Sequence, residues 1–190
     1  MRILNKQRLE KEIQALYRQF QDDTSETLTE EKFNTALTNI LNEQELETDG
    51  GVTRNVCGLI CDIRGFSQLV ENVSTTKVIQ LLNVFFGSMV DIIDSRGGQV
   101  NKFMGDSLIA FFDSGEDVRG SVLQVLECAI AMQLAMDDVN LKSHELGMDD
   151  VYMGIGIDTG EVVASVFGSD IFREFTIIGN PVNIASRIEG

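Results

Sequence analysis

Apolar residues recur at helical spacing in the first quarter of the chain and gather in shorter, denser runs after residue 50. Residues 1–48 carry two such stripes, separated by the polar stretch Asp22–Glu26, and Thr29 followed by two glutamates is typical of a helix start. This predicts two amphipathic helices, either a signalling or dimerising segment or a cap packed on its own core. The stripes are Leu9, Ile13, Leu16, Tyr17 and Phe20, then Phe33, Ala36, Leu37, Ile40 and Leu41.

After a linker at Glu47–Thr53, the pattern alternates between short apolar runs and longer helical stripes. The order strand, helix, strand, strand, helix, strand, strand predicts an α+β fold. It resembles the ferredoxin-like split βαβ arrangement, an antiparallel sheet with helices on one face, here preceded by the helical N-terminal segment. Strands are predicted at 56–63, 99–103, 107–112, 151–157, 161–167 and 175–178, and helices at 77–95, 122–139 and from Pro181 to Glu189.

Composition narrows the classes of partner. The net charge of −15 disfavours nucleic acid and anionic membrane surfaces, but not a nucleotide, whose phosphates can share a cation with carboxylates. No apolar run approaches 18 residues and no secretory signal is visible, so no membrane span is expected. Three cysteines in apolar runs predict buried free thiols in a reducing compartment, and hence a cytoplasmic protein.

Two aspartates are candidate metal ligands. Asp62 follows a buried strand and precedes the turn at Gly65, and Asp106 lies at a hairpin whose two-residue turn is predicted at Met104-Gly105. If the two strands are neighbours, both carboxylates reach one edge of the sheet, where Mg²⁺ could bind. Taken singly, Asp62 could instead be a helix N-cap, and Asp106 an aspartate that bonds amides of its own turn.

Polar residues on other elements are weaker candidates. In the predicted hairpin, strand alternation places Lys102 on the face opposite Asp106, so the two are not expected to serve one pocket. Asn183 and Arg187 are one helical turn apart and could contact a ribose and a phosphoryl group. By residue type alone, Lys102 could be a solvated lysine, Asn183 and Arg187 an ordinary polar helix face, and Thr176 a common strand residue.

Four stretches, in this order, resemble the class III nucleotidyl cyclase catalytic domain over residues 54–190. They are Cys-Asp-Ile-Arg-Gly-Phe-Ser at 61–67, Asn-Lys-Phe-Met-Gly-Asp-Ser at 101–107, Met-Gly-Ile-Gly-Ile-Asp-Thr-Gly-Glu-Val at 153–162, and Phe-Thr-Ile-Ile-Gly-Asn-Pro-Val-Asn-Ile-Ala-Ser-Arg at 175–187. Four ordered motifs are far more specific than any one of them alone.

The resemblance implies roles for residues. Two Mg²⁺ or Mn²⁺ ions would be held by Asp62, Asp106 and the Ile63 carbonyl, beside a phosphate-cradling turn at Gly65 and Phe66. The purine would be read by Lys102 and Thr176, the ribose oriented by Asn183, and the transition-state phosphate stabilised by Arg187. In this family the sites lie at a head-to-tail homodimer interface, with the aspartates from one chain and the purine and transition-state residues from the other.

The Lys/Thr pair resembles the adenylate type, which implies conversion of ATP to 3′,5′-cyclic AMP and pyrophosphate. The family's domain usually continues for further strands beyond the position of Gly190, so the chain is expected to be C-terminally truncated, with an upstream sensor possible. The alternatives are a catalytically silent module for dimerisation and signal relay, and a diguanylate cyclase or polymerase-like palm domain, whose Gly-Gly-Asp-Glu-Phe hairpin is absent.

Overall fold

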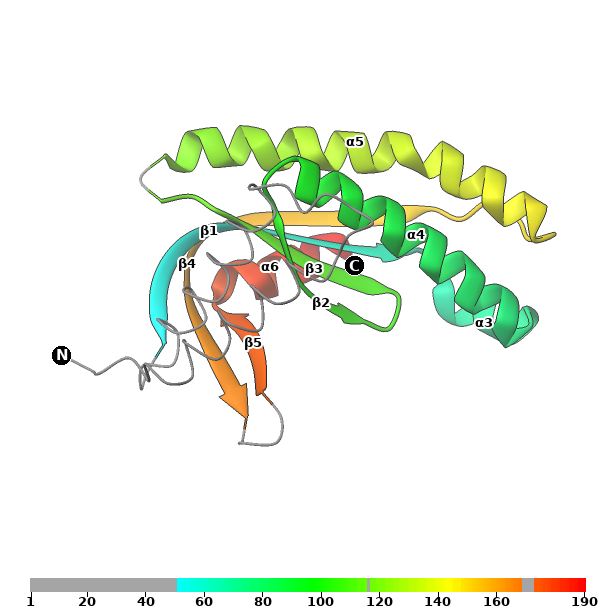
Figure 1. Cartoon of the computed structure of the whole chain (residues 1–190), viewed down its shortest axis with the longest axis horizontal. Coiled ribbons are helices and arrows are strands. Elements are labelled where there is room, and N and C mark those ends of the chain that lie inside the picture. Colours follow the sequence, from blue (N-terminus) through cyan, green and yellow to red (C-terminus); the bar gives the residue numbers. More distant parts are fainter. Residues whose placement is uncertain (1–50, 116, 169–172) are drawn as a thin grey trace, which may run out of the picture. The chain divides into compact units, whose positions relative to one another are not determined.

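The computed structural model describes residues 51–115, 117–168 and 173–190, and the helices predicted within residues 1–48 lie outside this part of the chain. The described elements, in chain order, are β1 (Val52–Ile63), α3 (Phe66–Asn72), α4 (Thr75–Ser95), β2 (Gln99–Met104), β3 (Ser107–Asp113), α5 (Val118–Glu145), β4 (Met153–Gly168), β5 (Arg173–Ile178) and α6 (Asn180–Glu189) (Figure 1).

The strands form one sheet in the order β2-β3-β1-β4-β5. β1 pairs antiparallel with β3, and β3 pairs antiparallel with β2, so β1 lies inside the sheet and its residues 56–61 are all buried. The predicted α+β fold with an antiparallel sheet is therefore confirmed. Residues 164–176, at the far end of the β4–β5 hairpin, belong to a separate compact unit from the body formed by Thr53–Val163 and Ile177–Gly190.

Helices α4 and α5 cover one face of the sheet and form the main core with it (Figure 1). Strand alternation sends Leu59, Cys61 and Ile63 of β1 into this core, where they meet Phe85 of α4 and Met132 of α5. The predicted buried free thiols are confirmed: all three cysteines are free and buried. Burial raises the pKa of the Cys61 thiol to about 12, which keeps it protonated and unreactive.

One described helix, α4, is long and apolar enough to cross a membrane by length and composition alone. Its apolar face is already used, because Val78, Leu81, Phe85, Met89 and Ile93 are buried against the protein. A core helix of this kind passes the same length and composition test as a membrane span. We therefore describe α4 as a helix of the domain core.

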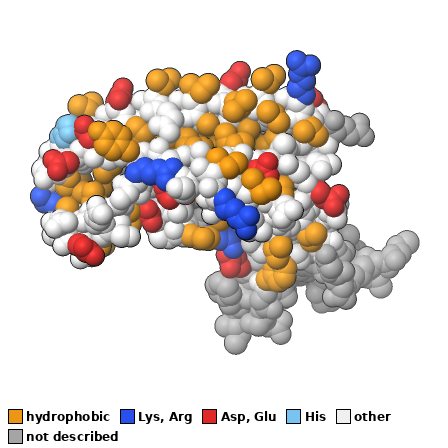
Figure 2. Space-filling model, turned by 180° about the vertical axis from the view of Figure 1, so that it is seen from behind, with side chains coloured by type: hydrophobic (Ala, Val, Ile, Leu, Met, Phe, Trp, Pro, Cys, Tyr) orange, Lys and Arg blue, Asp and Glu red, His pale blue; other side chains and the backbone are white. Residues whose placement is uncertain are grey.

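α5 carries a second apolar row on its outer side. Figure 2 shows hydrophobic side chains gathered along this helix, among acidic ones. The apolar stripe predicted only the middle of this helix, residues 122–139, because the buried positions beyond it at either end are the polar residues Ser121 and Ser143. The exposed row consists of Val118, Leu123, Leu126, Ile130, Leu134 and Leu141.

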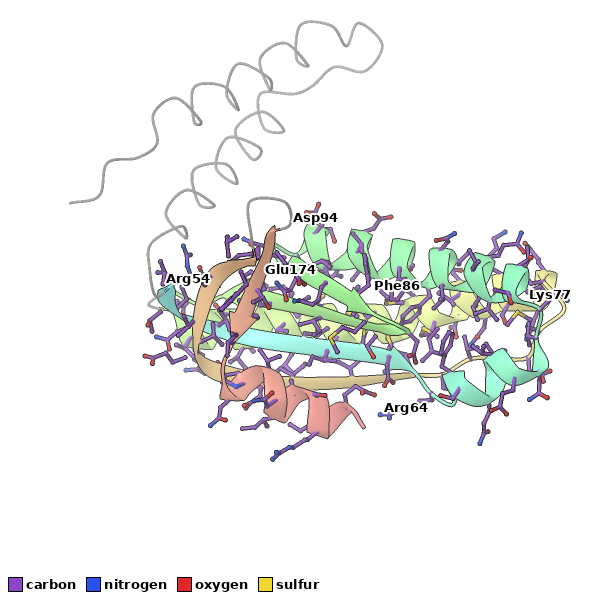
Figure 3. The ribbon with its side chains drawn as sticks, turned by 90° about the horizontal axis from the view of Figure 1, so that it is seen from below. Arg54, Arg64, Lys77, Phe86, Asp94 and Glu174 are labelled. Carbon is purple, nitrogen blue, oxygen red and sulfur yellow. The ribbon has the colours of Figure 1, made fainter. Side chains whose placement is uncertain are left out.

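Helix α6 packs on the other face of the sheet (Figure 3), through Ala185 against Ile60 and Ile109. Its approach to β4 is close enough to require glycine. A Cβ on Gly156 would overlap the Ala185 carbonyl and lie 2.7 Å from the Glu189 amide, and a Cβ on Gly154 would overlap the Arg64 guanidinium and the Glu189 carboxyl. The Met-Gly-Ile-Gly-Ile stretch is thus a strand with side chains on one face only.

Two predicted strands, 151–157 and 161–167, are one continuous strand, β4, so the predicted break at Thr159-Gly160 is wrong. Thr159 donates its hydroxyl to the Val56 carbonyl of β1 over 3.2 Å, which holds this part of β4 to the neighbouring strand. Gly160 is a site of close approach, because an added Cβ would lie 3.0 Å from Pro181 Cγ. Glycine at this position allows α6 to pack closely and does not mark a turn.

The Gly156 contact yields a stability prediction. Gly156→Ala should lower the free energy of unfolding by about 2–3 kcal/mol, since the new methyl group meets helix backbone that cannot move aside cheaply. The matched control is Gly87→Ala in α4, where no atom lies within 4 Å of the added Cβ and stability should be unchanged or rise by up to about 1 kcal/mol. Urea unfolding followed by circular dichroism measures both. Equal effects would contradict the packing argument.

Candidate functional site

Asp62 and Asp106 come together where β1 ends beside the β2–β3 turn. Burial raises the pKa of the Asp106 carboxyl, and the negative charge of Asp62 raises it further, while the backbone amides of Asp106 and Ile63 donate hydrogen bonds that lower it. Asp106 therefore bonds its own amide, as a turn aspartate does, and also the end of β1. The predicted juxtaposition of the two carboxylates is present in the structure.

Asp62 is not a helix N-cap. The short helix α3 begins after Gly65, which adopts the left-handed conformation with φ +69° and supplies no side-chain cap. Instead, Asp62 Oδ1 is buried without a hydrogen-bond partner. In the described part of the chain only one other buried side-chain nitrogen or oxygen lacks a partner, Oε1 of Glu189. A buried, unpaired carboxylate oxygen beside a second carboxylate is the arrangement that a hard cation satisfies.

Glu189, in the last turn of α6, is a residue of this site that sequence reasoning missed. It is buried, and burial together with the neighbouring Asp62 carboxyl raises its pKa to about 7, against a lowering by Arg64. Its signal was available: Pro181, Ala185 and Glu189 are the buried residues of α6, at i, i+4 and i+8. An acid on the apolar stripe of a helix is a candidate for a buried charge.

Arg64 supplies the positive charge of the site. Its Nη1 lies 3.1 Å from Glu189 Oε1 as an ion pair, without hydrogen-bond alignment, and its Nη2 donates to the Glu189 backbone carbonyl. Figure 3 shows Arg64 beside the end of α6. Among the described residues, no set of three or more His, Cys, Asp or Glu side chains is arranged to hold a metal ion. The cation ligands that fit are the two aspartates, with the Ile63 carbonyl beside them.

The turn after Asp62 offers backbone groups and not side chains. Gly65 is exposed, and nothing lies within 4 Å of the position a Cβ would take, so a ligand can approach its backbone. The Phe66 ring packs against the main core, which leaves its amide as the group that could reach a phosphate. The Ile63 side chain is likewise part of the core.

The turn used to predict the sheet face of Lys102 was placed at the wrong residues. The turn consists of Gly105 and Asp106, not Met104 and Gly105, because Met104 pairs with Ser107. From this turn the pairing runs regularly through Phe103 to Lys102, which lies opposite Ile109, a residue of the cluster on the α6 face. Asp62 lies on this same face, two residues after Ile60 of that cluster. Lys102 and Asp62 therefore share a face, with β3 between their strands.

Asn183 and Arg187 lie on the exposed side of α6. The buried side of the helix carries Ala185 against the sheet and Glu189 toward Asp62. The two predicted residues are thus turned away from the side of α6 that faces the aspartates of their own chain. Thr176 is half-buried in β5 and falls in the separate unit 164–176, so its relation to Lys102 stays a prediction.

Comparisons with known proteins identify the family. Residues 51–190 match the model of the adenylate and guanylate cyclase catalytic domain, and the chain belongs to this family. It is 34% identical over 151 residues to an adenylate cyclase of Anabaena cylindrica, covering 77% of this chain and 29% of that protein. The chain thus spans less than a third of the length of the curated relatives it matches.

Solved cyclase structures have the same fold. The guanylyl cyclase Cya2 superposes with a TM-score of 0.69 at 37% identity, covering 74% of this chain and 71% of that one. The adenylyl cyclase CyaB from P. aeruginosa superposes with a TM-score of 0.68 at 30% identity, covering 73% and 72%. These similar structures include both a guanylyl and an adenylyl cyclase, so the fold alone does not choose the purine.

The raised pKa of Glu189 predicts how stability changes with pH. The folded protein keeps the proton of Glu189 up to about pH 7, whereas the unfolded chain releases it near pH 4.5, so the group costs stability as pH rises between these values. Asp106 acts in the same direction. In a buffer without divalent cations, the thermal midpoint of the wild type should fall from pH 5 to pH 8. Glu189→Gln should make that fall smaller. The control is Asp91→Asn on the exposed side of α4. Parallel curves for wild type and Glu189→Gln would refute the assignment.

Proposed function

We propose that this chain is the catalytic domain of an adenylate cyclase, which converts ATP to 3′,5′-cyclic AMP and pyrophosphate. The observation that carries the proposal is the meeting of Asp62 and Asp106, with Asp62 Oδ1 buried and unpartnered, in a chain of the cyclase family. Asp62, Asp106 and the Ile63 carbonyl would hold Mg²⁺ or Mn²⁺. Two such ions, when bound, supply charge neutralisation for the triphosphate and acidify the ribose 3′-hydroxyl.

The site is shared between two copies of the chain in this proposal. Supporting it, Asn183 and Arg187 lie on the exposed side of α6, and the buried side of the same helix faces Asp62. Residues so placed can serve the aspartates of a partner more readily than their own. The exposed side of α6 also carries Ile184 and Ile188, apolar residues suited to a subunit contact.

Each residue has a distinct task in the proposed reaction. Gly65 and the Phe66 amide approach the phosphates, Asn183 orients the ribose, and Arg187 stabilises negative charge that grows on the α-phosphate. The ribose 3′ oxygen attacks the α-phosphorus in line, the bond to the bridging oxygen breaks, pyrophosphate leaves with the electron pair, and the 3′-hydroxyl proton passes to solvent.

Adenine selection is assigned to Lys102 and Thr176. A lysine and a hydroxyl accommodate the adenine N1 and its exocyclic amine, whereas guanine presents N–H donors that favour a carboxylate. Support comes also from the adenylate cyclase of Anabaena cylindrica, a relative over 77% of this chain. We further infer that the domain works in the cytoplasm, where ATP is available, and that residues 1–48 relay a signal from a sensor to the dimer.

The metal role of Asp62 is testable by activity. Asp62→Asn should lower kcat for cyclic AMP formation with Mn²⁺ by at least about 100-fold, because the substitution removes a charged ligand from the cations that neutralise the reacting phosphates. Asp91→Asn, which removes an exposed carboxylate from α4, should leave the rate within about twofold of wild type. Cyclic AMP quantified by mass spectrometry measures both. A wild-type rate no higher than that of Asp62→Asn would point to a silent signalling module.

The purine assignment has its own test. The double variant Lys102→Glu/Thr176→Cys should shift the ratio of kcat/KM for ATP over GTP toward GTP by at least about tenfold, since the carboxylate pairs with guanine N–H groups and not with adenine. Lys77→Glu, a half-buried lysine on α4, is the charge-matched control and should leave the ratio unchanged. An unchanged ratio in the double variant would count against this purine pair, while leaving the cyclase proposal standing.

A further inference from the structure

Arg64 and Glu189 have no part in the function proposed above, yet both lie against the acidic centre of the site, formed by Asp62 and Asp106. Glu189 is buried, with a side chain 7% exposed, which raises its pKa, and it lies close enough to Asp62 for the charge of Asp62 to raise that pKa further. Arg64 reaches the same glutamate twice, by an ion pair to its carboxyl and a hydrogen bond to its backbone carbonyl. The two residues are 125 positions apart in sequence, so tertiary structure alone brings them together.

The space for this pair is built into β4. A Cβ on Gly154 would overlap both the Arg64 guanidinium and the Glu189 Oε1, so the absence of a side chain there makes room for the contact. Arg64 is held on its other side as well, because its backbone amide donates to the Tyr152 carbonyl over 2.8 Å. The pair is thus fixed at both ends, by the end of β1 and by the last turn of α6.

Charge explains why the two residues occur together. Asp62, Asp106 and Glu189 place three acids in one small region, where burial, and then the charge of Asp62, raises the pKa of both Asp106 and Glu189. Arg64 offsets one of those charges. Removing Glu189 would leave a guanidinium beside the aspartates, which repels a cation, and removing Arg64 would leave an extra carboxylate, which attracts one.

We propose that Arg64 and Glu189 are a pair of positioning residues for the cation site, in which their ion pair ties the last turn of α6 to the end of β1 beside Asp62, and the charge of Glu189 offsets that of Arg64. This inference rests on the proposed function only in taking Asp62 and Asp106 as the cation ligands. Because α6 also carries Asn183 and Arg187, the pair fixes those exposed residues relative to the aspartates of the same chain.

The test measures binding of Mn²⁺ alone to the 190-residue chain by electron paramagnetic resonance, without nucleotide. At pH 8, where Glu189 is ionised, Glu189→Gln should raise the Mn²⁺ dissociation constant about tenfold, because the Arg64 charge is then unbalanced beside the aspartates. Arg64→Gln should lower the dissociation constant about threefold or more, because an extra carboxylate is left. The double variant should return to within about threefold of wild type, because charge balance is restored.

Each other outcome overturns the inference. Unchanged Mn²⁺ affinity in Glu189→Gln would show a merely structural role, and a double variant as weak as Glu189→Gln would show that Glu189 acts without Arg64. Should Glu189→Gln fail to fold, Arg64→Gln decides alone, since the Arg64 side chain is 43% exposed, and unchanged affinity there refutes the pair.

Asp62→Asn separates this inference from the proposed function. If Asp62→Asn binds Mn²⁺ like wild type, the cation site itself is misassigned and both fail. If it loses Mn²⁺ while the Arg64 and Glu189 variants bind normally, the inference about the pair fails alone. Gly154→Ala adds a variant with all charges kept: it should weaken Mn²⁺ binding by displacing the pair, and unchanged affinity would contradict the proposed positioning.

Discussion

The close approach of α6 to the bare glycine face of β4 is the constraint on which the rest of the site depends. Gly154 and Gly156 remove two side chains from that face, and Ala185 presents a small one from the helix, so helix and strand backbones come nearly into contact. Wider spacing would draw Glu189 away from Asp62. The glycines of this motif thus act on the chemistry indirectly, through the distance at which a helix can lie.

That placement gives α6 two separate duties. Its buried side completes the acidic centre of its own chain through Glu189, and its exposed side presents Asn183 and Arg187. A short helix with both duties transmits any movement of one side to the other, because the helix is rigid over this length. In the proposed shared site, a movement of Asp62 or Asp106 in one chain therefore also moves Asn183 and Arg187, which serve the neighbouring copy.

The sequence predicted an α+β fold with an antiparallel sheet, because hydrophobic period and turn residues report strands and helices locally. The meeting of Asp62 with Asp106 was predicted only on the condition that their strands are neighbours, and the pairing of β1 with β3 meets that condition. The sequence misplaced the β2–β3 turn by one residue, because Met104-Gly105 and Gly105-Asp106 both contain the glycine that such a turn needs, and residue type alone does not choose between them. It divided β4 at Gly160, since a glycine needed for helix packing looks like a glycine needed for a turn. It missed Glu189 although that acid lies on the buried stripe of α6, and it missed the partnership with Arg64, because only tertiary structure joins residues 125 positions apart.

The same separation has a consequence for how the protein is made. At common rates of synthesis, a delay on the order of ten seconds passes between the appearance of Arg64 and that of Glu189, 125 residues later. Late in this interval, once β4 (Met153–Gly168) has been made, the nascent chain has its aspartates and its glycine-faced strand, but no helix to cover them. The acidic centre thus cannot mature before α6 is synthesised, and until then the uncovered face of β4 is a surface on which a chaperone could act.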